Sequence, residues 1–311
     1  MKLDLNDRDR ICFFGDSITH HGWWISEIYQ YFTDNYPELN TMFFNCGVAG
    51  TRAKSANQKD RMYCDLFNFF PKYVVVMFGM NDVGTYLYDP LCTEDNKEKE
   101  RKQRIAEYRN SLDNIINLCK KENAIPIICT PTPYDEYNSF ESPNFYADKA
   151  LAQCSEIAKQ AANDNNLIFV DMRSIFFEHI NDKPIGNDRV HPNKFGHHLM
   201  AEKFLVSIGA KKQIEVNSKC DLSKINVERF KIEQILRNLF FVEMNYMGWQ
   251  NKKTMPLCDR KAEVSDRIKE LINPKDEWIK NTFNEYLEYA DYKNELTGKL
   301  ILLSSSIYNC K

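Results

Sequence analysis

The sequence has no long apolar run, no excess of basic residues and no closely spaced pair of cysteines within its 311 residues. Without a hydrophobic stretch of about 20 residues, no membrane span is expected. The formal net charge of −3 leaves no surplus of Lys and Arg for phosphate groups, which disfavours a nucleic-acid binder. The charged segment Met1–Arg10 lacks the apolar core of a secretory signal, so we expect a cytoplasmic protein.

The ten cysteines are spread along the chain, and the closest two, Cys119 and Cys129, are ten residues apart. That spacing fits neither a zinc knuckle nor a Cys-x-x-Cys redox pair. In a reducing cytoplasm such residues are expected to be free thiols. We therefore expect no metal site and no disulfide framework.

Five short apolar runs have the composition of strands that are buried on both faces: Arg10–Phe14, Thr41–Asn45, Tyr73–Phe78, Ile125–Thr130 and Leu167–Asp171. Longer amphipathic stretches separate them, and a last helix follows Pro192: Trp24–Tyr36, Glu100–Glu122, Phe145–Asn165 and Lys194–Ser207. This alternation predicts an α/β fold, in which helices cover both faces of a parallel sheet. The charge run Glu94–Arg104 is interpreted as a solvated loop that leads into a helix.

The character of the chain changes near residue 211, and all six histidines lie before that point. We therefore predict a first domain at 1–210 and a mainly helical C-terminal extension at 211–311. The extension carries an apolar stripe at Ile232–Phe240 and a second helical pattern at Asp276–Tyr292, but no chemical motif. It could pack as an added layer, cap a site or form a homo-oligomer interface, and the sequence does not choose among these roles.

Two polar motifs suggest a nucleophile and its base. Ser17 follows the first predicted strand, at the edge where a parallel sheet binds ligands. A serine hydroxyl needs a base, and Asp188-Arg189-Val190-His191 offers a histidine together with a carboxylate that can orient it. An Asp-Ser pair after a strand is also an ordinary helix N-cap, and a lone histidine is more often structural.

Two further motifs could supply donors for the oxyanion that forms when a serine attacks a carbonyl group. The backbone N–H of Gly47 follows the second predicted strand, and the side-chain amide of Asn81 follows the third. The Ser17 N–H would be another donor. Because glycine and asparagine are also common in turns, each motif taken alone has a purely structural explanation.

Together these motifs resemble those of the SGNH hydrolases in the GDSL esterase–lipase superfamily. Four blocks match in order over residues 8–208: Gly15-Asp16-Ser17-Ile18, Asn45-x-Gly47-x-x-Gly50, Gly79-x-Asn81-Asp82 and Asp188-x-x-His191. The resemblance implies a flavodoxin-like three-layer α/β/α sandwich with a five-stranded parallel sheet, and no metal or organic cofactor. It also assigns the roles: Ser17 as nucleophile, His191 as base, Asp188 as its orienting group, and an oxyanion hole of Ser17, Gly47 and Asn81.

The family does not determine the substrate. Asn81-Asp82-Val83-Gly84, followed by Tyr86 and Tyr88, resembles its sugar-deacetylating branch. We therefore expect a serine ester hydrolase that removes acetyl or other short acyl groups from a small or oligosaccharide ester. The alternatives are a lysophospholipase or thioesterase, a sugar O-acyltransferase, and a catalytically silent carbohydrate-binding module.

Several residues near the motifs have a more open role. Asp16, Trp23 and Asp82 are candidate substrate contacts, although a tryptophan at that place could equally pack inside a helical layer. His20 and His21 are expected at the surface or behind the site, and His197 and His198 in helix packing.

Overall fold

The computed structural model describes residues 3–6, 9–39, 41–67, 70–91, 96–180 and 184–214. The chain divides into two units, Met1–Ile225 and Asn226–Lys311, and every described residue belongs to the first. The predicted helices of the C-terminal extension, including the stripe Ile232–Phe240, therefore lie outside the described residues. Their role stays a prediction.

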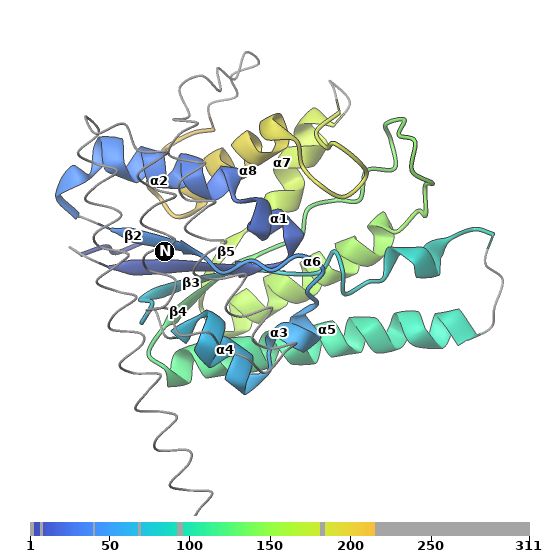
Figure 1. Ribbon diagram of the computed structural model, residues 1–311, viewed down its shortest axis with the longest axis horizontal. Coiled ribbons are helices and arrows are strands. Elements are labelled where there is room, and N and C mark those ends of the chain that lie inside the picture. The colour runs from blue at the N-terminus through green and yellow to red at the C-terminus, as the bar shows by residue number, and fades with distance from the viewer. Residues whose placement is uncertain are drawn as a thin grey trace, which may run out of the picture. The chain divides into compact units, whose positions relative to one another are not determined.

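A five-stranded parallel sheet forms the centre of the described unit (Figure 1). Its strands are β1 (Arg10–Gly15), β2 (Met42–Asn45), β3 (Tyr73–Met77), β4 (Ile125–Cys129) and β5 (Ile168–Val170). They are arranged in the order β2-β1-β3-β4-β5, which is the order of flavodoxin-like folds. The predicted fold class and all five predicted strands are confirmed. No strand end differs by more than one residue from its predicted position.

Helices cover both faces of this sheet. The helices are α1 (Ser17–His21), α2 (Trp23–Asn35), α3 (Ala53–Ala56), α4 (Lys59–Asp65), α5 (Asn96–Lys121), α6 (Asp148–Asp164), α7 (Met172–His179) and α8 (Lys194–Ser207), with short 3-10 turns at Pro37–Leu39 and Thr85–Tyr88. In Figure 1, α2, α7 and α8 lie on one side of the sheet, and α3 to α6 lie on the other. The result is the predicted three-layer sandwich.

Apolar burial explains why these segments form these elements. All five residues of β3 are buried, as expected for a central strand that is covered on both faces. On α5 the residues that face the sheet recur at helical spacing and are at most 2% exposed: Leu112, Ile115, Ile116 and Cys119. α8 begins after Pro192, where the side chain of Asn193 caps it by accepting a hydrogen bond from the Gly196 N–H at 3.0 Å.

From Asn96 onward the charge run Glu94–Arg104 is helical, contrary to our interpretation of it as a loop, because α5 already begins at Asn96. Its arginines bind other groups along and beside the helix. Arg101 donates through Nε to the Leu87 carbonyl at 3.0 Å, and Arg104 pairs with Glu100 at 2.9 Å. Pairs of opposite charge four residues apart support a helix, so a mixed-sign run is compatible with its first turns.

In the described part of the chain, no helix has both the length and the apolar character needed to cross a membrane. The following cysteines are buried free thiols, as expected: Cys12, Cys46, Cys119, Cys129 and Cys154.

The strand order creates a switch point between β1 and β3. The chain leaves β1 toward β2 on one side, and later returns to place β3 on the other side. In such sheets a crevice opens at the carboxyl ends of the strands where the order reverses. Ser17 and the loops after β2 and β3 all leave the sheet at this edge.

Trp24 offers a test of the packing that supports this edge. Its side chain is fully buried, with ring centroids 5.1 Å from Phe13 and 5.9 Å from Phe204. Trp24→Ala should lower the free energy of unfolding by about 3–5 kcal/mol, because it leaves a large cavity. Trp23→Ala is the control, since that ring is only half-buried, and should cost about 1 kcal/mol or less. Urea unfolding measures both changes, and equal losses of unfolding free energy in the two variants would contradict this packing.

Candidate active site

Ser17 lies directly after β1, as the first residue of α1. The turn before it requires glycine, because a Cβ at Gly15 would lie 2.1 Å from Thr19 Oγ1 and 2.6 Å from the Met77 carbonyl oxygen. Asp16 then caps the helix by accepting a hydrogen bond from the Ile18 N–H at 3.0 Å. The Ser17 side chain is thereby held at the carboxyl edge of the sheet.

A continuous chain of hydrogen bonds joins Ser17, His191 and Asp188. Ser17 Oγ lies 3.0 Å from His191 Nε2, and His191 Nδ1 lies 2.9 Å from Asp188 Oδ2. With the proton on Nδ1, the ring donates to Asp188 and leaves Nε2 to accept from the serine hydroxyl. This is the arrangement that an activated serine nucleophile needs.

Asp188 is held in its charged form. Partial burial alone would raise the pKa of this carboxyl, but hydrogen bonds from the His191 side chain and from the His191 and Val190 amides lower it overall. The two backbone N–H groups donate to Oδ1 at 2.6 and 2.7 Å, so Oδ2 is directed to the imidazole. A fixed carboxylate can orient the ring and stabilise it once it becomes protonated.

Arg189, inside the same motif, was not predicted to matter. Its buried guanidinium donates to three backbone carbonyls of the loop after β4, those of Asp135, Asn138 and Ser142, at 2.8 to 3.1 Å. The loop that carries Asp188 and His191 is thereby fastened to its neighbour. Only the position of this residue between two candidate catalytic residues could have indicated it from the sequence.

The loops after β2 and β3 are joined by polar contacts. The side-chain amide of Asn81 donates to the Thr51 carbonyl at 3.1 Å. Asp82 accepts from the Ala53 N–H at 2.8 Å and from the Gly79 N–H at 3.1 Å. Within the described residues the second Asn81 N–H has no acceptor, and it could therefore bind a substrate oxygen.

Gly47 has a less open environment than the oxyanion role requires. Its N–H donates to Asn45 Oδ1 at 3.0 Å, and its carbonyl oxygen lies 3.1 Å from His20 Nδ1. A Cβ at Gly47 would lie 2.4 Å from the backbone nitrogen of His20, so glycine is needed there for close backbone packing. Its role as a donor stays a prediction, and it requires that the bond to Asn45 be exchanged for one to the substrate.

Gly50, in the same loop, is a further candidate that the sequence analysis quoted only as part of a motif. It is exposed, has a φ of +72°, and a Cβ there would meet nothing within 4 Å. Within the described residues its N–H donates no hydrogen bond. Thr51, the residue that follows it, supplies the carbonyl that accepts from Asn81, so Gly50 is close to the candidate hole.

Asp16 and Asp82 are not placed as substrate contacts. Asp16 is 2% exposed and Asp82 is 1% exposed, and both side chains accept hydrogen bonds from backbone amides. Burial raises the pKa of Asp16 to about 7 and that of Asp82 to about 6. These carboxyls therefore hold the turns of the site in place, and we do not propose them as groups that touch the substrate.

The other residues singled out in the sequence lie on α1, α2 and α8. The exposed ring of His21 has its centroid 5.3 Å from that of His191. Trp23 remains a candidate substrate contact, and Lys194 Nζ lies 5.0 Å from the centre of its ring. His197 is buried, and burial lowers its pKa to about 3, which fits the expected packing role.

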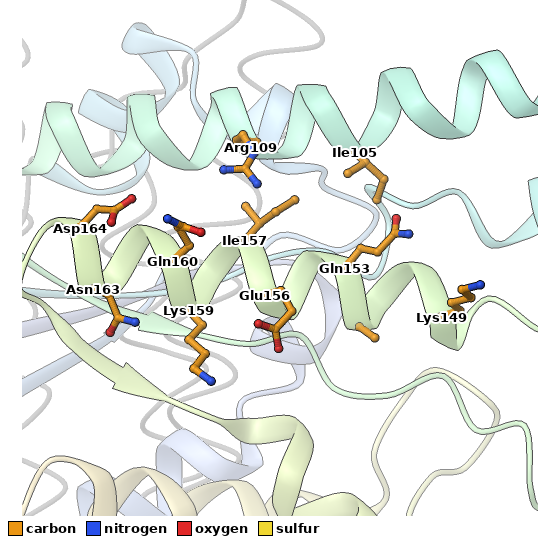
Figure 2. A pocket seen from close by; sticks show the side chains of 11 residues that line it. Ile105, Arg109, Lys149, Gln153, Glu156, Ile157, Lys159, Gln160, Asn163 and Asp164 are labelled. Carbon is orange, nitrogen blue, oxygen red and sulfur yellow. The ribbon is translucent and has the colours of Figure 1, made fainter.

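A hollow lies between α5 and α6 (Figure 2). Ile105 and Arg109 line it from α5, and Glu156 and Ile157 line it from α6. None of its lining residues belongs to the four motifs or to the loops at the carboxyl edge of the sheet. We therefore place the candidate site at Ser17 and not in this groove.

Comparison with known proteins gives a consistent result. A family model described as GDSL-like lipase/acylhydrolase matches residues 11–204. An acetylxylan esterase of Geobacillus stearothermophilus is 26% identical over 225 residues, which are 67% of this chain and 97% of that protein. Its crystal structure superposes with a TM-score of 0.56 at 25% identity, and covers 70% of this chain and 100% of that one.

Two further points come from solved structures. Catalytic mutants of that esterase replace a serine, an aspartate and a histidine, and the last two are three positions apart, as Asp188 and His191 are here. A gut microbial diltiazem-metabolizing enzyme is 19% identical with a TM-score of 0.68, and covers 99% of this chain and 96% of that one. This second likeness shows the fold alone.

The buried Asp16 carboxyl predicts a pH-dependent stability. Its pKa of about 7 in the folded protein exceeds the value near 4 that an unfolded chain has, so the folded state binds the extra proton between these values. Stability should therefore fall as the pH rises from about 4 to about 7. Asp16→Asn keeps an oxygen for the Ile18 N–H but cannot ionise. Between about pH 5 and about pH 8, the free energy of unfolding should fall less in Asp16→Asn than in the parent protein. The difference between the two losses should be at least about 1 kcal/mol.

Urea unfolding at the two pH values measures this difference. Asp113→Asn, on the exposed face of α5, is the matched control and should keep the pH dependence of the parent. If Asp16→Asn and the parent lost the same stability between the two pH values, Asp16 would not carry the buried proton.

Proposed function

We propose that this chain, which belongs to the GDSL-like lipase/acylhydrolase family, removes acetyl or other short acyl groups from a carbohydrate through a covalent acyl-enzyme. It is a carboxylic ester hydrolase. The observation that carries the proposed mechanism is the hydrogen-bonded chain from Ser17 through His191 to Asp188.

Acylation begins at the serine hydroxyl. Ser17 Oγ attacks the ester carbonyl carbon while His191 Nε2 takes the hydroxyl proton, and the carbonyl π electrons move to the oxygen. Asp188 stabilises the imidazolium that results, because its charged carboxylate already accepts from Nδ1. The tetrahedral intermediate then expels the alcohol, which leaves with the proton that His191 returns.

The oxyanion is stabilised by N–H donors of Ser17 and of the loops after β2 and β3. We assign the free N–H of the Asn81 side chain and the backbone N–H of Ser17 to this role. The loop after β2 supplies a third donor, either Gly47 as predicted or Gly50, whose amide has no other acceptor within the described residues. Preorganised donors of this kind are each worth about 10²–10³ in turnover.

Deacylation repeats the same chemistry with water. His191 takes a proton from a water molecule, which attacks the acyl carbon, and the proton then passes to Ser17 Oγ as the acid leaves. The alcohol leaves in the first half-reaction and the free acid in the second. Ser17, His191 and water carry every proton in these steps, so they invoke no metal or organic cofactor.

The carbohydrate assignment is supported by a relative and by an aromatic side chain. The relative is named an acetylxylan esterase, and 97% of its length aligns with this chain. The half-buried ring of Trp23, which begins the helix after α1, offers an apolar surface against which the apolar face of a sugar ring could pack.

The covalent step can be tested with a fluorophosphonate probe, which reacts with activated serines. We expect the parent protein to be labelled on Ser17, and Ser17→Ala and His191→Ala to lose the label, because nucleophile and base act together. Ser207→Ala is the control, since that hydroxyl binds the Lys203 carbonyl of its own helix, and it should label like the parent. If folded Ser17→Ala were labelled as strongly as the parent, Ser17 would not be the nucleophile, and the alternative of a catalytically silent binding module would be favoured.

The acyl and alcohol parts can be tested in parallel. We expect acetate release from acetylated xylan, acetylated monosaccharides or acetylated cell-wall glycans, with Ser17→Ala as the blank. Among p-nitrophenyl esters, acetyl should exceed chains of about eight carbons by at least about tenfold in kcat/KM. A preference for the long chains would favour the lysophospholipase or thioesterase alternative. Acylated sugar formed in place of acetate would favour an O-acyltransferase.

A further inference from the structure

We propose that Glu107, on α5, is a positioning residue of this esterase, which holds the loop after β2 so that Thr51 directs the Asn81 amide at the oxyanion. The inference rests on the proposed function, because it concerns the same oxyanion hole. Glu107 lies in none of the four motifs, and nothing in its sequence context distinguishes it from the other charged residues of the helix.

The carboxylate of Glu107 binds two cations from one short segment. Oε2 lies 2.6 Å from an Arg52 guanidinium nitrogen, and Oε1 lies 2.6 Å from Lys54 Nζ. Gln103, one turn earlier on α5, donates to the same Oε1 at 2.9 Å. Glu107 therefore ties the start of α3 to α5 at two points, and its own rotamer is supported from within the helix.

The segment that Glu107 holds is also bonded to the loop after β3. Arg52 follows Thr51, whose carbonyl accepts from Asn81, and precedes Ala53, whose N–H donates to Asp82. The residues on either side of Arg52 thus bind the two neighbouring residues of the third motif. A shift of this segment would move the acceptor that fixes the plane of the Asn81 amide.

The direction of that amide decides whether the second Asn81 N–H can donate to the oxyanion. A planar amide has two N–H bonds at a fixed angle, so the bond to the Thr51 carbonyl determines where the other points. Oxyanion donors act by being directed in advance at the charge that develops. Loosening Thr51 should therefore reduce turnover more than it reduces substrate binding.

Glu107 keeps its charge under all ordinary assay conditions. Partial burial would raise the pKa of its carboxyl, but hydrogen bonds from Lys54, Gln103 and Arg52 lower it to about 2. The clamp is therefore not a pH switch. Because the side chains of Arg52 and Lys54 are 27% and 55% exposed, both cations keep contact with solvent when Glu107 is neutralised, and the fold should survive.

A double-mutant cycle separates positioning from a merely structural role. With p-nitrophenyl acetate, we expect Glu107→Gln to lower kcat by roughly tenfold with little change in KM, and Asn81→Ala to lower it by about 10²–10³. In the Asn81→Ala background, Glu107→Gln should have less than about a twofold effect, since the amide it positions is absent. Lys54→Gln removes one arm of the clamp and should lower kcat by about threefold.

Glu98→Gln is the matched control. Glu98 is on the same helix and also faces two cations, Arg101 at 3.8 Å and Lys102 at 3.2 Å, but within the described residues no hydrogen bond or ion pair joins it to Asn81 or to the loop after β2. It should leave kcat unchanged, and thermal melts should show that every variant is folded.

Two results would overturn the inference while leaving the esterase assignment in place. One is an effect of Glu107→Gln that is as large in the Asn81→Ala background as in the parent. The other is an unchanged kcat in both Glu107→Gln and Lys54→Gln. Full activity of Asn81→Ala is a different failure, because it would remove Asn81 from the oxyanion hole itself.

Discussion

The hydrogen bond between Ser17 and His191 joins residues 174 positions apart, and the site exists only because the sheet and one helical layer bring them together. Ser17 follows β1, which is fixed between β2 and β3 inside the sheet. His191 precedes α8, which packs on α2, the helix that follows α1 in the chain. Apolar packing of α2 and α8 over β1 thus determines whether the hydroxyl and the imidazole meet.

A second layer of organisation is polar and acts on the loops. Asp82 binds the amides of Gly79 and Ala53, so one buried carboxyl links the loop after β3 to the loop after β2. Burial makes its charge costly and raises its pKa to about 6, but two N–H donors offset part of that cost. Buried polar groups that are fully bonded specify one arrangement, which is what a preorganised oxyanion hole requires.

Much of this could be predicted from the sequence, because buried parallel strands are continuous apolar runs and their carboxyl ends share one edge. Tyr73–Met77 is such a strand, and its position alone places Asn81 near Ser17. What could not be predicted depends on which partner a polar group finds in three dimensions. The N–H of Gly47 turns to Asn45, and the carboxylate of Glu107 turns inward to two cations. Neither the spacing of motifs nor the periodicity of apolar residues indicates these partners.

The charged residues of α5 illustrate the same limit and show what such residues do in this fold. A mixed-sign segment predicts exposure, and the outer face of α5 is indeed exposed, but several of its charges bind the loops that leave the sheet. Arg101 holds the Leu87 carbonyl after β3, and Glu107 holds Arg52 after β2. Because the apolar core fixes the strands and these partly exposed polar contacts fix the loops, a change in the second group can alter catalysis while leaving global stability nearly unchanged. Stability and activity are therefore governed by different residues of the same helix.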